Sequence, residues 1–392
     1  MMWREIIEKK TAQIRREGKE RFFTQTRDAT ETELMWQGRR LLNLASNNYL
    51  HLAGDPRLIK AQQQAATIYG AGATASRLIA GNYELYGQAE QMLCNWKQEE
   101  AGLLINSGYT LNIGLFQALC NRHTIVFSDQ YNHASMIDGV VLSRAQLKRY
   151  KHVDMADLER QLQKADPDKL KIIATESVFS MDGDVAPLTQ LIELKKRYNA
   201  LLIVDEAHAT GVFGPFGQGL VAEQNLTRDV DIQIGTFSKA LGSFGAYLVG
   251  DAWLVDYLKQ TMRSLIFTTA LPPAVLGSII QSIEIVQTAD ERRLALFEKA
   301  AYFRKSIQEA GFHTYRSTTQ IIPIHIGSNQ AAVQFAKHLQ ANGVAAIPIR
   351  PPTVPENQAR IRFAVTVAHT KEMLDEAAHI IQRSHERLGA IR

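Results

Sequence analysis

The chain has 392 residues, of which 45% are hydrophobic and 21% are charged, and its formal net charge at pH 7 is +4. It is long enough to bury a large core and suits two domains better than one, and its composition is ordinary for a globular protein. The small net charge and the lack of any dense lysine and arginine block exclude nucleic acid as an expected partner.

The sequence carries no signal for a membrane or for secretion. No apolar run reaches the length of a membrane span, and the N-terminus, MMWREIIEKK, is charged from its fourth residue and lacks a long apolar core. Cys94 and Cys120 are far from any Cys-x-x-Cys spacing, so we expect both to be buried free thiols in a reducing compartment. These features together predict a cytoplasmic protein.

The first half of the chain alternates strands with helices. Residues 3–17 have the pattern of an amphipathic helix, and residues 40–53 are typical of a short strand that leads into a turn. From Arg57 onward, helical stretches alternate with short strands rich in Leu and β-branched residues. The predicted strands are residues 102–106, 124–129, 171–177, 200–207 and 231–237. This alternation predicts an α/β fold, a mostly parallel sheet with helices on both faces.

The pattern changes in the last quarter of the chain. Residues 287–311 form a long predicted helix, and three strand-like stretches follow at 320–327, 344–355 and 359–366, with one helix between the first two and another at the end. This order is typical of an α+β domain. We therefore expect an N-terminal helix and strand segment over residues 1–50, a large α/β domain over 51–287 and a small α+β domain over 288–392.

Polar residues follow the predicted strands, at the edge where open parallel sheets bind ligands. They are Gly108 and Tyr109, Asp129 and His133, Glu176 and Ser180, Asp205 and His208, and Thr236, Ser238 and Lys239. A helix that begins at Ser-Gly offers unpaired N–H groups to a phosphate, and the hydroxyls of Thr236 and Ser238 are placed to complete such a site.

A lysine beside a phosphate site, with an acid on a separate strand, is what pyridoxal phosphate (PLP) requires. The lysine forms a Schiff base with the cofactor aldehyde, and the acid keeps the pyridine nitrogen protonated so that the ring accepts electrons. We therefore predict a PLP site with Lys239 and Asp205 in these roles and a histidine against the ring. No metal ion is expected.

Each of these residues alone has a plainer explanation. Lys239 by itself would be a surface lysine, Asp205 a buried structural acid and His133 a structural histidine. We expect His152 and His338 to be structural, because neither has such neighbours.

Two short motifs point elsewhere but lack the context they need. GAGATASR, at residues 70–77, does not follow the apolar strand of a dinucleotide-binding motif. DEAH, at residues 205–208, also occurs in NTPases, which require a loop that ends in Gly-Lys-Ser/Thr. The one Gly-Lys pair in this sequence is followed by Glu20.

The chain resembles the α-oxoamine synthases, a family of fold-type-I PLP enzymes. The stretches that carry the resemblance run in order from about residue 43 to 370 and so cover nearly the whole chain. They are SNNYLHLAGDPRL, GAGATASRLIAGN, SGYTLN, NHASMIDG, ESVFSMDGDVAPL, VDEAHATGVFG, GTFSKALG and RPPTVPENQARIRF. The resemblance implies a PLP-dependent acyltransferase and a homodimer whose active site forms at the subunit interface.

The RPPTVP stretch at residues 350–355 indicates the branch of the family. Together with VFSMDGD and NHASMIDG it most resembles the members that condense L-alanine with a pimeloyl thioester, carried by CoA or by acyl-carrier protein, in biotin biosynthesis. Two alternatives stay open. One is a sister synthase that uses glycine or serine, similar to 2-amino-3-ketobutyrate CoA ligase, and the other is a non-catalytic relative.

The resemblance also implies roles by position. Lys239 matches the Schiff-base lysine and Asp205 the partner of the pyridine nitrogen. His133 matches the ring-stacking histidine, which also contacts substrate, and His208 the histidine near the ring hydroxyl. The remaining cofactor contacts are Gly108, Tyr109, Ser180, Thr236, Ser238 and Thr269, the last reaching the phosphate held by the partner subunit.

The implied substrate contacts come from both ends of the chain. Arg362 resembles the arginine that receives the amino-acid carboxylate, and Asn47 lines the same pocket. Arg21 and Thr353 match contacts on the acyl side. The terminal carboxylate of pimelate needs a positive partner, and Arg21 and Arg350 are the candidates.

Three positions depart from the family pattern. His51 replaces a usual glycine, Glu206 replaces an aspartate seen in some members, and Phe267 stands where a tunnel tyrosine is common. None belongs to the predicted cofactor set, but His51 and Phe267 leave the preferred acyl chain length open.

Overall fold

The computed structural model describes residues 2–387, which form two compact units. Unit 1 contains the residues up to Tyr49, the segment Met181–Asp184 and the residues from Ala295 onward. Unit 2 contains Leu50–Ser180 and Val185–Leu294.

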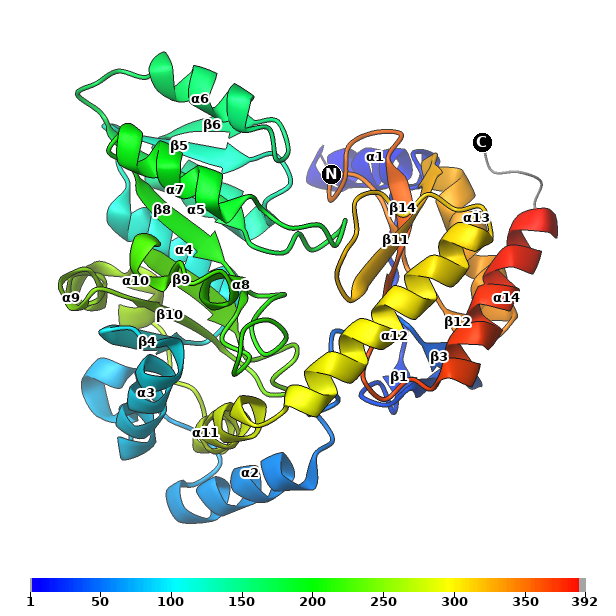
Figure 1. Ribbon diagram of the computed structural model, residues 1–392, viewed down its shortest axis with the longest axis horizontal. Coiled ribbons are helices and arrows are strands. Elements are labelled where there is room, and N and C mark those ends of the chain that lie inside the picture. The colour runs from blue at the N-terminus through cyan, green and yellow to red at the C-terminus, as the bar shows by residue number, and fades with distance from the viewer. Residues whose placement is uncertain (1, 388–392) are drawn as a thin grey trace. The chain divides into compact units, whose positions relative to one another are not determined.

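Unit 2 is built on a seven-stranded sheet (Figure 1). Across the sheet its strands are β4 (Ala101–Ile105), β10 (Ala246–Gly250), β9 (Ile232–Thr236), β8 (Leu201–Asp205), β7 (Leu170–Glu176), β5 (Thr124–Asp129) and β6 (Gln146–Tyr150). Strand β10 is antiparallel to both of its neighbours, and the pairs from β9 to β6 are parallel. Because strands β5, β7, β8 and β9 all run the same way, their carboxyl ends meet at one edge of the sheet.

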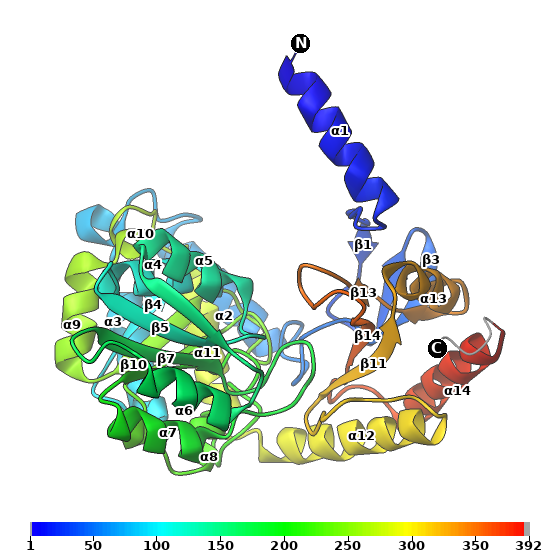
Figure 2. The same ribbon diagram turned by 90° about the horizontal axis from the view of Figure 1, so that it is seen from above.

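Helices cover both faces of this sheet. They are α2 (Pro56–Tyr69), the π-helix η1 (Arg77–Gly81), α3 (Glu84–Lys97), α4 (Gly108–Leu119), α5 (Ala134–Ser143), α6 (Met155–Gln163), α7 (Leu188–Arg197), α8 (Leu220–Glu223), the 3-10 helix η2 (Thr227–Asp229), α9 (Ala252–Thr261), α10 (Arg263–Ile266) and α11 (Pro273–Gln287). In Figure 2, α4 and α5 lie on one side of the strands and α6 and α7 on the other. Buried side chains of α4, α5 and α9 pack on the sheet in one apolar cluster that includes Phe116, Met136 and Leu254.

Unit 1 joins the two ends of the chain. Its elements are α1 (Met2–Arg16), β1 (Thr26–Arg27), β2 (Glu33–Trp36), β3 (Arg39–Asn43), β11 (Ile321–Gly327), α13 (Asn329–Ala341), β12 (Val344–Ala345), β13 (Pro348–Ile349), β14 (Ala359–Ala364) and α14 (Lys371–Arg387). Helix α12 (Asp290–Glu309) begins in unit 2 and continues into unit 1. Strand β12 pairs in parallel with β3, so one four-stranded sheet contains segments about 300 residues apart. A second sheet, β11-β14-β13, is antiparallel.

The predicted α/β fold is confirmed, with a mostly parallel sheet and helices on both faces. The five strands predicted between residues 102 and 237 are present within one or two residues as β4, β5, β7, β8 and β9. The division at residues 50/51 and 287/288 stays a prediction; in the structure the N-terminal strands share a sheet with β12.

The two cysteines differ in their burial. Cys120 is buried, but Cys94 is only half-buried on α3, so the prediction of two buried thiols was wrong for one of them. Burial raises the pKa of both thiols, to about 11 for Cys94 and about 12 for Cys120. Within the part of the chain that the structure describes, every helix is too short or too polar to cross a lipid bilayer.

Candidate active site

The carboxyl edge of the large sheet gathers the acidic ends of three strands. Strands β5, β7 and β8 end at Asp129, Glu176 and Asp205, and the register pairs Glu176 with Asp205. Paired residues of neighbouring strands point to the same face of a sheet, so these two carboxyls are neighbours. Asp129 differs from these two carboxyls in its partners. Its carboxylate accepts from His152 Nδ1 at 2.9 Å and from the Val153 amide at 2.9 Å. This bond fits the structural role predicted for His152.

Lys239 lies three residues beyond the end of β9, on a tight turn. Its Nζ is 3.0 Å from Nε2 of His208, which follows β8. The turn closes at Gly242, whose N–H donates to the Lys239 carbonyl at 3.0 Å and whose φ is +64°. A Cβ there would lie 2.4 Å from the Ala53 nitrogen, so only glycine lets the chain turn this closely against Ala53. The turn thus holds the lysine against the histidine.

Asp205 is buried and lies among charged groups. Its Oδ1 accepts from the Ala207 amide at 2.9 Å, and its Oδ2 accepts from Asn112 Nδ2 at 3.4 Å. Burial raises the pKa of Asp205, while the positive charge of Lys239 acts in the opposite direction. A buried carboxyl of this kind is stabilised in its charged form by a cationic partner.

His133 precedes helix α5 and caps it. Its Nδ1 is 2.7 Å from Ser135 Oγ and accepts from the Ser135 amide at 3.3 Å. Burial lowers the pKa of His133 and Lys239 lowers it further, whereas Asp205 and Asp138 raise it. The imidazole is therefore favoured in its neutral form.

The N-terminus of α4 keeps two amide groups unpaired. Ser107 caps the helix by accepting from the Thr110 amide at 3.3 Å, and its own amide donates to Thr110 Oγ1 at 3.2 Å. Among the described residues, no acceptor pairs with the N–H of Gly108 or Tyr109. A Cβ on Gly108 would meet open space. These two amides can therefore receive an anion.

The hydroxyl residues of the predicted set differ in their surroundings. The buried Thr236 donates to the Gly245 carbonyl at 2.8 Å and accepts from the Ser238 amide at 3.1 Å. Ser180 is buried, and its amide donates to Glu176 Oε2 at 3.0 Å. Thr269 is exposed, and its carbonyl accepts from Asn106 at 2.9 Å.

The predicted substrate residues other than His133 lie in unit 1. Arg362 donates to Asn47 Oδ1 at 3.0 Å and to the Tyr49 hydroxyl at 3.2 Å. Arg350 donates to the carbonyls of Gly18 and Glu20, and its pKa is lowered by burial and by the positive charge of Arg21. Thr353 is exposed, and its amide donates to the Arg350 carbonyl at 3.1 Å. Unit 1 thus brings together two groups of the predicted residues, one around Arg362 and one around Arg350.

The sequence did not single out Asn112 or Ser135, although both are buried and both contact predicted residues. Asn112 Nδ2 lies 2.9 Å from Ser135 Oγ. Their positions in the sequence could have identified them as candidates. Asn112 lies four residues after Gly108 in α4, and Ser135 lies two residues after His133. Asn112 thus lies about one helical turn from Gly108, and Ser135 lies still nearer to His133 in sequence.

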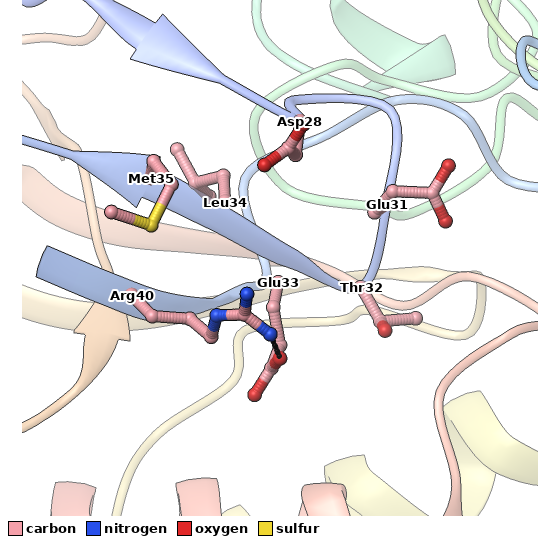
Figure 3. Close-up of a pocket in the computed structure, with 7 residues that line it drawn as sticks. All are labelled: Asp28, Glu31, Thr32, Glu33, Leu34, Met35 and Arg40. Atoms are coloured by element: carbon pink, nitrogen blue, oxygen red, sulfur yellow. Dashed lines mark hydrogen bonds and ion pairs between the residues drawn. The ribbon is translucent and has the colours of Figure 1, made fainter.

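A pocket of about 320 Å³ lies elsewhere, at the β2–β3 hairpin of unit 1 (Figure 3). Its lining residues are Asp28, Glu31, Thr32, Glu33, Leu34, Met35 and Arg40. Arg40 donates to Glu33 at 3.1 Å, and none of the predicted site residues lines this pocket. Within residues 2–387, no group of His, Cys, Asp and Glu side chains is placed to hold a metal ion.

Comparison with known proteins gives matches along nearly the whole chain. A family model described as aminotransferase class I and II matches residues 39–381. A Bacillus cereus (strain ATCC 10987) protein named "Putative 8-amino-7-oxononanoate synthase" is 53% identical over 382 residues, which is 97% of each chain. A Bacillus mycoides protein of the same name is 52% identical over 387 residues, which is 98% of each chain.

Solved structures with the same fold include two serine palmitoyltransferases. The enzyme of Sphingomonas wittichii is 28% identical, with a TM-score of 0.92 over 99% of this chain and 98% of its own. That of S. paucimobilis, solved with bound PLP and myriocin, is 27% identical, with a TM-score of 0.92 over 98% of each chain. The 8-amino-7-oxononanoate synthase of Francisella tularensis is 26% identical, with a TM-score of 0.77 over 88% of this chain and 98% of its own.

Proposed function

The chain belongs to the class I and II aminotransferase family and, within it, to the 8-amino-7-oxononanoate synthases, and on that premise we propose that it condenses L-alanine with a pimeloyl thioester. The products are 8-amino-7-oxononanoate, CO2 and a free thiol, and the reaction belongs to biotin biosynthesis. The observation that carries the proposal is the 53% identity to a relative of that name over 97% of both chains.

The residues of unit 2 fit PLP. Asp205 is a buried carboxyl whose raised pKa calls for a cationic partner, which the protonated pyridine nitrogen is. The unpaired amides of Gly108 and Tyr109 suit its phosphate, and Lys239 lies on the same sheet edge to bond its aldehyde. When bound, PLP supplies an aldehyde that takes up an amino group and a ring that accepts the electrons released at the α-carbon.

The protein's own residues then move a proton and orient the reacting groups. Lys239 Nζ removes the α-proton of L-alanine and returns it after decarboxylation. His208 Nε2, 3.0 Å from that nitrogen, holds the lysine in position and can exchange a proton with it. His133, Ser180, Thr236, Ser238 and Thr269 are proposed as further cofactor contacts.

The charged residues of unit 1 are proposed to bind the substrates. Arg362 donates hydrogen bonds to Asn47 Oδ1 and to the Tyr49 hydroxyl, and its guanidinium is proposed to bind the carboxylate of L-alanine as well. Arg21, Arg350 and Thr353 are proposed on the acyl side. The acyl donor is either pimeloyl-CoA or pimeloyl-acyl-carrier protein.

A homodimer in the cytoplasm is proposed for the working enzyme. The family resemblance supports the dimer, with Thr269 contributing to the partner subunit's phosphate site. Cys94 and Cys120 are both free thiols, as is usual in a reducing compartment.

A sister synthase that uses glycine or serine is the second candidate. Serine palmitoyltransferases share the fold of this chain, with TM-scores of 0.92, but their identity of 27–28% weighs less than the 53% identity to the Bacillus cereus relative. A non-catalytic relative is the third, and the complete set of Lys239, Asp205 and His133 argues against it.

The test is a spectrum followed by an assay. The purified protein with PLP should absorb in the visible range, and the band should be lost in Lys239→Ala. L-alanine with pimeloyl-CoA should then release thiol, while glycine and serine should not. Thiol release with glycine or serine instead would move the function to the sister synthase, and no band would overturn the PLP site.

A further inference from the structure

A chain of hydrogen bonds connects the buried carboxylate of Asp205 to the ring of His133. Asp205 Oδ2 lies 3.4 Å from Asn112 Nδ2, that nitrogen lies 2.9 Å from Ser135 Oγ, and Ser135 Oγ lies 2.7 Å from His133 Nδ1. The two middle residues are almost fully buried, with 2% of Asn112 and 0% of Ser135 exposed. Water therefore does not compete for these bonds.

The direction of the bonds follows from what each group can donate. An ionised carboxylate only accepts, so the atom of Asn112 that faces Asp205 is the amide nitrogen. The second hydrogen of the same nitrogen is then available to donate to Ser135 Oγ. The reverse orientation would place the amide oxygen of Asn112 against a carboxylate oxygen, which is repulsive.

Two donors then meet at Nδ1 of His133. The amide of Ser135 donates to Nδ1 at 3.3 Å, and a backbone N–H cannot turn away to become an acceptor. Because Ser135 Oγ already accepts from Asn112, its own hydrogen is free to donate to Nδ1 as well. A hydrogen on Nδ1 would point at both of these donors.

We infer that Asn112 and Ser135 are positioning residues that fix His133 as the neutral tautomer with its hydrogen on Nε2. His133 then offers a hydrogen-bond donor through Nε2 and has no basic nitrogen open to a substrate. Such a donor suits a carboxylate or a carbonyl oxygen that gains negative charge, and does not suit proton removal from carbon. The tautomer stands on the geometry alone, whereas its catalytic use rests on the proposed function.

The tautomer can be measured directly in the full-length protein without cofactor. Protein labelled with 15N-histidine gives separate nitrogen signals for a protonated and an unprotonated ring nitrogen, and His133→Gln assigns the signals of His133. We expect one neutral form, with the hydrogen on Nε2. A hydrogen on Nδ1, or a rapid mixture of both forms, would overturn the inference.

Ser135→Ala tests the role of the hydroxyl, and Ser143→Ala is the matched control. Ser143 lies on the same helix, and its hydroxyl donates to the Val140 carbonyl at 2.7 Å, away from His133. In Ser135→Ala only the longer bond from the backbone amide still holds Nδ1, so we expect a detectable share of the Nδ1–H form and a kcat lower by roughly tenfold, with both unchanged in the control. An unchanged tautomer in Ser135→Ala would refute the positioning role.

The NMR measurement and the thiol-release assay also distinguish a failure of this inference from a failure of the proposed function. If the wild-type protein shows the expected tautomer but releases no thiol, the proposed function fails and the tautomer stands. If Ser135→Ala does not fold, as judged by its melting curve, the wild-type spectrum alone still decides the inference.

Discussion

Glu176 and Asp205 stand side by side at the ends of neighbouring parallel strands, with only 3% and 8% of their surfaces exposed. Burial raises the pKa of Glu176 to about 8, and the charge of Asp205 raises it as well, against the opposing effect of Lys239. Two adjacent buried carboxyls share one environment, so ionising the second costs more than ionising the first. Glu176 is therefore the carboxyl that we expect to stay neutral at pH 7.

The first prediction concerns how stability depends on pH. A carboxyl whose pKa is raised by folding contributes stability that is complete below its unfolded value, near 4.5, and is lost as the pH rises through about 8. The melting temperature of the wild-type protein should therefore fall as the pH rises from about 5 to about 8. Glu176→Gln cannot ionise, so its melting temperature should fall less over that range.

The control for this prediction is Glu284→Gln, which replaces an exposed carboxyl on α11. Its melting curve should follow that of the wild-type protein at every pH. Parallel curves for wild type and Glu176→Gln would mean that Glu176 is not the group that titrates.

The second prediction concerns a buried ion pair beneath the DEAH segment. Lys97 and Glu206 are both fully buried, with Nζ 2.9 Å from Oε2, and Lys97 also donates to the Gln218 carbonyl. Removing one member of such a pair leaves the other charge buried without a partner. Lys97→Met should therefore lower the free energy of unfolding by about 3–5 kcal/mol. Adding Glu206→Gln should recover part of this loss, because glutamine is neutral and still accepts from the Val221 amide.

Urea unfolding followed by tryptophan fluorescence would measure both variants. If the double variant is more stable than Lys97→Met, the instability of Lys97→Met comes from the unpaired charge of Glu206. If the instability came from lost packing, the two substitutions would add their losses. A double variant less stable than Lys97→Met would therefore contradict the ion-pair explanation.

The strands of the large sheet could be predicted because they are short apolar runs that end in polar residues. Strand β10 was not predicted, although its sequence, AYLVG, is a short apolar run of the same kind, because it directly follows the glycine-rich turn after Lys239 and was read as part of that turn. Strand β6 was not predicted because its sequence, QLKRY, is mostly polar. This strand lies at the edge of the sheet. A strand at an edge has one open side and needs less apolar surface, so hydrophobic periodicity does not reveal it.

The residues of the candidate site could likewise be predicted only in part from the sequence. Residues directly after strands, such as Asp205, could be predicted because parallel strands place their ends together. Asn112 and Ser135 could not, because their importance comes from a tertiary arrangement in which α4 and α5 face one another. The pairing of β12 with β3 could not be predicted either, because β12 has only two residues and so shows no hydrophobic periodicity.

The third prediction concerns the amino-acid carboxylate. Arg362→Lys keeps the charge but loses the planar guanidinium that contacts Asn47 and the Tyr49 hydroxyl. The KM for L-alanine should rise by roughly tenfold, and the KM for the pimeloyl donor should stay within about twofold. Steady-state kinetics with each substrate varied in turn would measure this. Equal increases in both values would count against a carboxylate site at Arg362.

The last prediction concerns the far end of the acyl chain. Arg21 and Arg350 are close enough for Arg21 to lower the pKa of Arg350, and neither forms a salt bridge with any residue in the described range. Arg350 gives its hydrogen bonds to the carbonyls of Gly18 and Glu20, which belong to the segment that leads to the exposed Arg21. Two neighbouring positive charges that form no salt bridge favour an anion, and the terminal carboxylate of pimelate is the anion that the proposed substrate offers. Arg21→Ala should therefore raise the KM for pimeloyl-CoA by at least roughly tenfold and leave the KM for L-alanine unchanged.

Two comparisons decide this prediction. A thioester of the same length without the terminal carboxylate should react equally well with the wild-type protein and with Arg21→Ala, because it has no charge for the arginine to bind. Arg27→Ala removes another exposed arginine of unit 1, which lies 3.5 Å from Asp28, and should leave both KM values unchanged. If Arg21→Ala weakened the two thioesters equally, the arginine would act by shaping the chain around Arg350, and the carboxylate of pimelate would need another partner.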